Sequence, residues 1–234
     1  MSESTPRLVM LMPVLFMLLA GGLVWLAWWQ NKKRREATQR FAAARGWTYS
    51  ADVPGLITRW RSEPFGRGGS KRATHVLTGT FQGRQVVSFD YQYTTGSGKN
   101  RSTSYFHVVA LSLPAALPWL QLTNDGTGAA ISKFFGGQDV DFESAAFNEA
   151  WRVQAAPPPQ YAYDFVHPRM MDRLMAADAV GKSITVEGAD IFLVCSGRQV
   201  LEAIDIYVNL LYGVDQLIPR QLWLKVGYDP LAAA

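Results

Sequence analysis

The longest apolar run of the chain lies near its N-terminus. No ionisable or amide side chain occurs between Leu8 and Trp29, and a helix of this length spans about 33 Å at about 1.5 Å per residue, enough for a bilayer core. Trp25, Trp28 and Trp29 gather at its end, where indole rings favour the headgroup boundary. The basic residues follow the run instead of preceding it, which favours an anchor over the alternative, a cleaved signal peptide. The boundaries predicted from this pattern are a short tail at 1–7, a transmembrane helix at 8–29, a basic juxtamembrane helix at 30–45 and a single α+β globular domain at 46–234.

Alternation of apolar and polar residues is clearest in the next third of the chain. His75–Phe81 and Arg84–Tyr93 are rich in β-branched and aromatic residues and flank Gln82-Gly83, which predicts a hairpin. Ser104–Leu113 is apolar on both faces, as in a strand covered on both sides, and Pro114 is expected to end it.

The second half of the chain has shorter patterns. They predict two short strands or a strand and a turn, one helix opening at a proline, a hairpin around a Glu-Gly-Ala-Asp turn, a longer amphipathic helix and a last strand. The ranges, in this order, are 139–143 with 147–153, 168–177, 183–194, 199–212 and 222–226. Because most strands run consecutively and two helices come late, we expect an α+β fold with a mainly antiparallel, meandering sheet.

The chain has a basic isoelectric point, near 9.2, and the distribution of its charged residues shows where this excess of positive charge lies. The chain has 23 Lys and Arg against 19 Asp and Glu, but the surplus lies before Phe41 and the rest is formally neutral. A basic nucleic-acid-binding domain is therefore not expected.

The basic cluster after the apolar run carries the topology prediction. The residues assigned to the membrane surface and topology are Lys32, Lys33, Arg34, Arg35, Arg40, Trp25, Trp28 and Trp29. The excess of basic residues on this side predicts a single-pass protein of the plasma membrane with its N-terminus outside and its domain in the cytoplasm. Anionic headgroups of the inner leaflet are the expected partner, through general attraction or, alternatively, through specific recognition of a lipid. A protein partner stays open.

Cofactor and metal motifs are incomplete. Cys195 is the only cysteine, and His75, His107 and His167 share no short spacing, so no metal site is expected. The glycine-rich segment 93–100 lacks the first glycine and the Ser or Thr of a phosphate-binding loop. We expect no bound cofactor.

Asp90 and His107 are the weak candidates for catalysis. If the loop near Ser97–Lys99 closes a simple antiparallel pair, Asp90 and His107 lie opposite each other, where a carboxylate can orient an imidazole. A structural Asp–His pair, or two unrelated residues, is the alternative. Cys195 follows Ile191 and Leu193 on one strand face and is interpreted as an inert thiol.

Several motifs carry a resemblance. Phe142-Glu143-Ser144, Trp151-Arg152-Val153 and His167-Pro168-Arg169 resemble those of uncharacterised bacterial, actinobacterial-type, membrane-anchored proteins that carry a domain of unknown function. An acidic residue expected shortly after Val153 is absent. The resemblance implies a fold unit and an anchor, and no catalytic assignment.

These observations support three hypotheses. The first is a membrane-anchored binding or scaffold domain without enzymatic activity. The second is a membrane-tethered hydrolase or transferase that uses Asp90 and His107. The third is a lipid- or small-ligand-binding domain in which a curved sheet encloses an apolar cavity.

Overall fold

The computed structural model describes residues 5–124 and 138–232, and the side chains of its first helix from Phe16 onward. The helices are α1 (Thr5–Ala44), α2 (Ala145–Ala150), α3 (Gln160–Phe165), α4 (Pro168–Leu174), α5 (Ile204–Leu217) and α6 (Arg220–Lys225), with short 3₁₀ helices η1 (Pro54–Thr58), η2 (Gly98–Asn100) and η4 (Leu201–Ala203). The strands are β1 (Thr48–Asp52), β2 (Gly69–Phe81), β3 (Arg84–Thr95), β4 (Ser102–Asn124), β5 (Gln138–Val140), β6 (Trp151–Ala155) and β7 (Ser183–Ser196).

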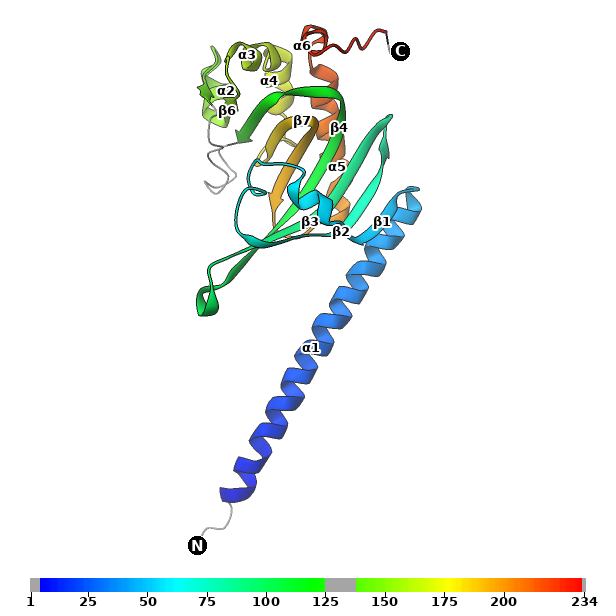
Figure 1. The fold of residues 1–234 in the computed structure, drawn as a ribbon, viewed down its shortest axis with the longest axis vertical. Helices are drawn as coiled ribbons and strands as arrows, with labels where there is room; N and C mark the ends of the chain where they lie inside the picture. The colour runs from blue at the N-terminus through cyan, green and yellow to red at the C-terminus, as the bar shows by residue number, and fades with distance from the viewer. Residues whose placement is uncertain (1–4, 125–137, 233–234) are drawn as a thin grey trace.

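The strands form one antiparallel sheet, ordered β1-β2-β3-β4-β6-β5, in which β7 also pairs with β4. The long strand β4 lies between β3 and β7 in its first half and between β6 and β7 in its second half. The helix α1 projects from the side of the sheet where β1 and β2 lie (Figure 1). The expected α+β class with consecutive antiparallel strands is therefore correct for the sheet domain.

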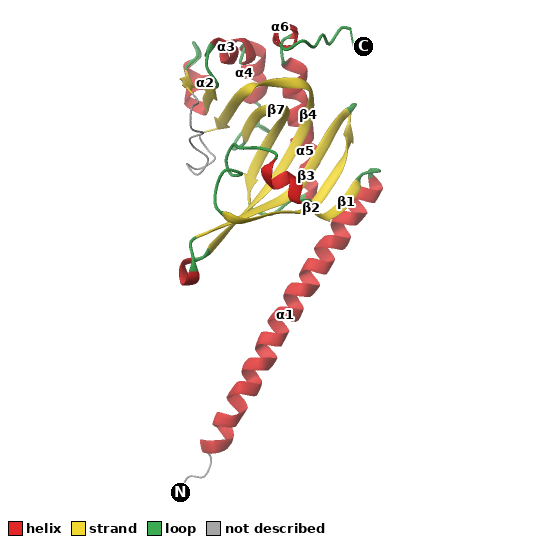
Figure 2. Ribbon diagram, in the orientation of Figure 1, coloured by secondary structure: helices red, strands yellow, loops and turns green. Residues whose placement is uncertain are grey.

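Two apolar clusters cover the two faces of the sheet. The larger cluster joins the sheet to α4, α5 and α6 and includes Leu111, Leu120, Leu193 and Leu211. The smaller cluster lies under the irregular segment 53–68, where Trp60 and Phe65 pack against Phe89, Tyr91 and Phe192. In Figure 2, α5 lies behind the sheet and the irregular segment, which contains the short helix η1, lies in front of it.

The predicted transmembrane helix is wrong, and with it the anchored fold class. One continuous helix, α1, runs through the predicted span and the predicted juxtamembrane helix. Within the residues described, no helix holds an apolar segment long enough to cross a bilayer. The side chains of residues 8–15 and the tail before Thr5 lie outside the description.

The C-terminal end of α1 packs on the edge of the sheet. Thr38 and Ala42 are buried there, and Gly46, with φ of +66°, turns the chain after the helix. Trp47 then lies flat on Gly79, where an added Cβ would approach the indole to 2.2 Å. The helix is thus fixed to β1 and β2 by its last three turns.

The prediction for the first hairpin is confirmed. Arg84 pairs with Phe81 across the Gln82-Gly83 turn, and both strands extend beyond the predicted ranges. The helix at Pro168 is also confirmed. The long amphipathic helix is confirmed with a later start at Ile204, because residues 201–203 form η4.

Two strand predictions are wrong because bulges replace the expected turns. The predicted hairpin at 183–194 is one strand, β7, in which Gly188 takes φ of +63° without reversing the chain. Strand β4 does not end at Pro114, because Pro114 and Pro118 lie where the β4–β7 pairing is interrupted, between Ser112 and Leu120. A proline is tolerated in a strand where no ladder hydrogen bond is lost.

Two short elements also differ from the predictions. Residues 147–150 of the second predicted strand belong to α2, whose first turn is capped by Ser144, and the strand β6 begins only at Trp151. The predicted last strand at 222–226 is α6, because Leu222 and Trp223 are adjacent and both buried, which a strand exposed on one face does not allow. The polar and glycine-rich residues 124–130 and 136–137 predict further breaks in the secondary structure, and all of them after Asn124 lie outside the described residues.

Candidate functional site

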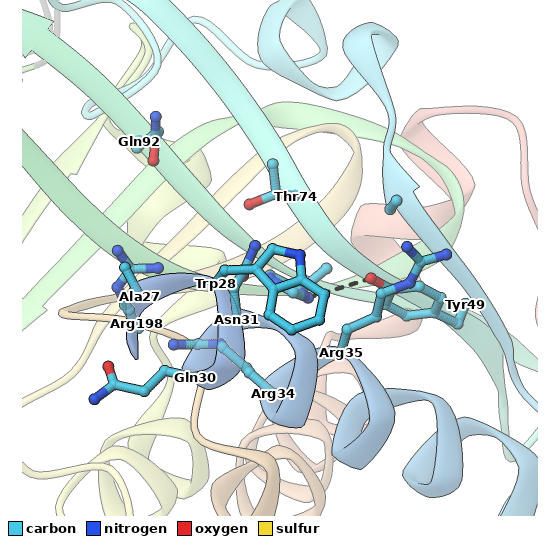
Figure 3. A pocket seen from close by; sticks show the side chains of 12 residues that line it. Ala27, Trp28, Gln30, Asn31, Arg34, Arg35, Tyr49, Thr74, Gln92 and Arg198 are labelled. Carbon is cyan, nitrogen blue, oxygen red and sulfur yellow. Dashed lines mark hydrogen bonds between the residues drawn. The ribbon is translucent and has the colours of Figure 1, made fainter. Parts of the chain in front are cut away.

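A polar cavity of about 850 Å³ lies between α1 and the sheet. Three elements contribute to it: one face of α1 near its middle, the edge formed by β1, β2 and β3, and the turn that follows β7 (Figure 3). We call it the basic cavity, lined by Ala27, Trp28, Gln30, Asn31, Arg34, Arg35, Tyr49, Ala51, Thr74, His75, Gln92 and Arg198.

Three arginines reach the basic cavity from two elements distant in sequence. Arg34 and Arg35 follow each other on α1, whereas Arg198 comes after β7, where Gly197 has φ of +98° and turns the chain. The guanidinium of Arg198 lies 4.2 Å from the ring centre of Tyr105, a stacking contact that orients it.

Arg34 is held by the sheet. Its Nη2 lies 2.9 Å from Asp90 Oδ2 and donates to the carbonyl of Gln199 at 3.0 Å. The backbone N–H of Gln199 donates to the same carboxylate, so Asp90 ties α1 to the turn after β7. Burial lowers the pKa of Arg34 from its ordinary value; Asp90 opposes this effect and the positive charge of Arg198 adds to it.

His75 forms part of the wall as a neutral side chain. It has φ of +52° at the irregularity between Thr74 and Leu77, where the pairing of β2 with β3 shifts register. Its Nδ1 lies 3.3 Å from the hydroxyl of Tyr49. Burial lowers the pKa of His75, and three arginines reinforce this against Asp90, so the arginines carry the positive charge of the cavity.

Arg35 and Arg198 are the charges available to a ligand. Within the part of the chain that the structure describes, neither forms an ion pair, and both are exposed. Guanidinium groups present several donors in a planar fork that matches phosphate and carboxylate groups. The basic cavity is therefore suited to an anion, and Ala27 and Trp28 give it an apolar border.

The predicted opposition of Asp90 and His107 is confirmed. They are direct partners in the β3–β4 register, and Cys195 is the partner of His107 on β7, so the three lie in one row across the sheet. The hydrogen bonds nevertheless separate Asp90 from His107. Asp90 is occupied by Arg34 and the N–H of Gln199, whereas His107 Nε2 lies 3.0 Å from Ser88 Oγ.

His107 is buried and uncharged. The N–H of Val200 donates to its Nδ1 at 3.4 Å, so the proton of the neutral ring resides on Nε2 and points to Ser88. Burial, with a smaller effect of Arg34, lowers the pKa of His107 to about 4. With only 1% of its surface exposed, it has no contact with solvent through which a substrate could be reached. This geometry favours a structural role for His107, and the catalytic use of Asp90 and His107 stays a prediction.

Cys195 shares this environment. Burial raises the pKa of its thiol, a change that Tyr207 and Lys182 partly oppose. A thiol held in its protonated form is a weak nucleophile, in agreement with its interpretation from the sequence.

The sequence pattern found only part of the site. The sequence pattern assigns Arg34 and Arg35 to topology and gives no signal of the bonds from Arg34 to Asp90 and Gln199. Arg198, Tyr49 and Gln92 were not singled out, because a single arginine after a strand gives no signal until the topology brings that turn to α1.

Metal and nucleotide chemistry find no support in the described part of the chain. It holds no group of three or more His, Cys, Asp or Glu side chains that could bind a metal. The glycine-rich segment 93–100 forms the end of β3, a turn and η2, not the start of a long helix.

Comparison with known proteins shows a fold and no family. A scan against protein-family models finds no match, and a search of curated proteins finds none either. A crystal structure of the mycobacterial trehalose monomycolate transport factor A, TtfA, is similar, with a TM-score of 0.61 and 14% identity over 78% of this chain and 93% of that chain. At this identity the likeness shows that the two proteins share a fold. The resemblance to membrane-anchored proteins of unknown function stays a prediction.

Proposed function

We propose that this protein is a membrane-associated binding protein whose basic cavity holds the anionic headgroup of a lipid. The observation that carries the proposal is the position of the two available arginines, Arg35 and Arg198, beside the apolar part of α1. The likeness in fold to TtfA also supports the proposal, since that protein is named for the transport of trehalose monomycolate, which suggests a lipid-related role.

The apolar surface of α1 explains why a lipid suits the cavity better than a soluble anion. Large apolar side chains from Phe16 to Trp29 are exposed, Phe16 to 74% and Trp28 to 59%. Trp28 belongs both to this surface and to the lining of the cavity. A lipid can therefore place its acyl chains along α1 and its headgroup between Arg35 and Arg198, which satisfies both kinds of surface.

The basic residues of α1 also suggest which leaflet of the membrane the protein contacts. Lys32 and Lys33 extend the positive charge beyond the cavity, and Lys33 Nζ lies 3.6 Å from the ring centre of Trp29. Tryptophan beside lysine is typical of a segment at the headgroup level, and the cytoplasmic leaflet carries the negative surface charge that attracts such segments. We place the domain on this face of the membrane, in contact with the bilayer through α1. A single-pass topology with an outer N-terminus is not included, since it requires the span that the described helix lacks.

Binding of a soluble short-chain lipid tests the cavity separately from the bilayer. Dihexanoyl phosphatidylglycerol is titrated into the full chain below its micelle concentration and followed by calorimetry. Arg35→Gln with Arg198→Gln is expected to weaken binding by tenfold or more, since a hydrogen bond to a charged group contributes about 1.5–3 kcal/mol. Arg61→Gln with Arg169→Gln removes the same charge from exposed arginines outside the cavity and should leave binding unchanged.

Two further titrations identify the source of the anion. Inorganic phosphate should bind far more weakly than the lipid, and dihexanoyl phosphatidylcholine should also bind weakly, because its headgroup is neutral overall. Equal affinity of the cavity variant and the wild type for the anionic lipid would refute the proposal. Equal affinity for phosphate and lipid would replace the lipid with a free anion.

A further inference from the structure

The hairpin of β3 and β4 extends beyond the sheet. Thr95 and Ser102 form its last pair, β2 reaches only as far as Thr94, and β7 reaches only as far as Phe106. All residues from 95 to 102 are exposed. The tip therefore lies past the pairing of β7 with β4, open to solvent, with only the start of β2 beside its base.

The charge at this end of the sheet has one sign. We define the basic hairpin end as Arg67, Lys71, Arg72, Lys99 and Arg101. Segments 66–72 and 94–106 contain no acidic residue, and among the five basic residues only Arg67 has a described acidic partner, Glu63. A groove of about 470 Å³, lined by glycine backbone, hydroxyl groups and Arg101, runs along it. Such a surface attracts anions over a distance of about 10 Å at moderate ionic strength.

The basic hairpin end is continuous with the basic cavity. Gln92 lines the cavity and pairs with Arg72 on β2 and with Tyr105 on β4. Tyr105 in turn carries the guanidinium of Arg198 on its ring. In Figure 1 the hairpin tip and the N-terminal end of α1 project from the same end of the sheet domain. Cavity, helix and hairpin thus present positive charge to one side.

We propose that the basic hairpin end is a second contact with an anionic membrane surface, which fixes the orientation of the domain. The inference rests on the proposed membrane association but uses residues that the basic cavity does not contain. With α1 alone, the domain would be free to tilt on the leaflet. With the hairpin as a second contact, the mouth of the cavity is held toward the headgroups.

Vesicle binding of the full chain tests the energetic part of this proposal. Vesicles of phosphatidylcholine with phosphatidylglycerol should bind Lys99→Gln with Arg101→Gln about tenfold to thirtyfold more weakly than the wild type, the effect of two basic residues near an acidic leaflet. Arg61→Gln with Arg169→Gln is the matched control for charge. An equal loss in both variants would overturn the proposal, because it would show an effect of net charge only.

A probe on the tip tests the geometric part. Ser97→Cys labelled with nitrobenzoxadiazole, in a Cys195→Ser background, should shift its emission to the blue on anionic vesicles and not on pure phosphatidylcholine. The same label at Arg169→Cys on α4 should not respond. A silent tip on vesicles that do bind the protein overturns the second contact and leaves the lipid site standing. If the label on the tip responds but the cavity variant binds the lipid as tightly as the wild type, the lipid site is overturned and the second contact stands.

Discussion

The two long helices meet the same sheet in different ways. Helix α5 covers one face with the apolar side chains of Ile204, Val208, Leu211 and Val214, all buried. From Phe16 onward, where the side chains of α1 are described, only Thr38 and Ala42 are buried at the edge of that sheet. Polar contacts to Asp90 and the turn after β7 complete the attachment of the helix.

The difference shows where space for a ligand arises. Apolar packing fills the volume between α5 and the sheet, because each void there forfeits dispersion contacts. Directional contacts fix α1 at a few points and leave the basic cavity open beside them. Substitutions at the α5 interface should therefore act on stability, whereas those at the α1 interface should act more on binding and on local order.

The largest effect is expected in the α5 interface. Leu211→Ala removes a fully buried side chain, and the lost burial and the cavity left behind should lower the free energy of unfolding by about 3 kcal/mol. Urea unfolding followed by circular dichroism measures this change. Leu224→Ala on α6, an exposed leucine, is the control and should stay within about 0.5 kcal/mol. Equal effects of the two would refute the assignment of α5 to the core.

The ion pair of α5 should give the next effect. Burial raises the pKa of Asp215. Arg84 opposes this rise by its charge and by a hydrogen bond of 3.1 Å from its Nε to the carboxylate. Arg84→Ala leaves this carboxyl buried without its partner and should cost about 2 kcal/mol, less than a fully buried pair because Arg84 is partly exposed. Asp215→Asn added to Arg84→Ala should recover part of the loss in the same unfolding assay. No recovery would show that Arg84 stabilises through packing alone.

His107 should make stability depend on pH. Its folded pKa of about 4 lies below the value of about 6.5 expected in the unfolded chain. Between these values only the unfolded state binds the proton, so this contribution is intact above pH 6.5 and decreases as pH falls. The unfolding free energy should fall by about 1 kcal/mol from pH 6.5 to pH 5.5. His107→Gln should flatten this part of the profile, and an unchanged slope would contradict the neutral, buried state of His107.

The smallest effect is expected where α1 meets α5. Arg45 forms an ion pair with Asp205, but both side chains are substantially exposed. Arg45→Ala should therefore change the free energy of unfolding by about 0.5 kcal/mol or less. A double-mutant cycle with Asp205→Ala measures the coupling, and a value above about 1 kcal/mol would place α1 among the strongly packed elements.

The sequence predicts the parts of this fold that local periodicity determines. The β2–β3 hairpin and the stripe of α5 are recognisable because a tight turn or a helical repeat is written in neighbouring residues. The continuity of β7 and of β4 cannot be recognised from neighbouring residues. Gly188 and Pro118 resemble turn signals until the two strands pair and accommodate each other's irregularities. The junction of α1 with the sheet depends on pairing across more than 160 residues, from Arg34 to Gln199.

The candidate site divides in the same way. Asp90 and His107 could be placed opposite each other from a loop centre, but their hydrogen-bond partners, Gln199 and Val200, come from a distant turn. These partners determine that Asp90 neutralises Arg34 and that His107 is a structural residue. Residue type and register were predictable, and chemical role was not.

The continuity of α1 has a mechanical consequence. A helix without interruption from Thr5 to Ala44, clamped at one end, behaves as a stiff shaft about 60 Å long at about 1.5 Å per residue. The direction in which each half of the helix faces is therefore fixed by the number of residues between them. One alanine inserted after Asn31 would rotate the half that carries the tryptophans by about 100° about the helix axis, relative to the half that carries the arginines. In the proposed mode of binding, the headgroup and the acyl chain would then no longer lie on a common line, although every side chain of the proposed lipid site would still be present.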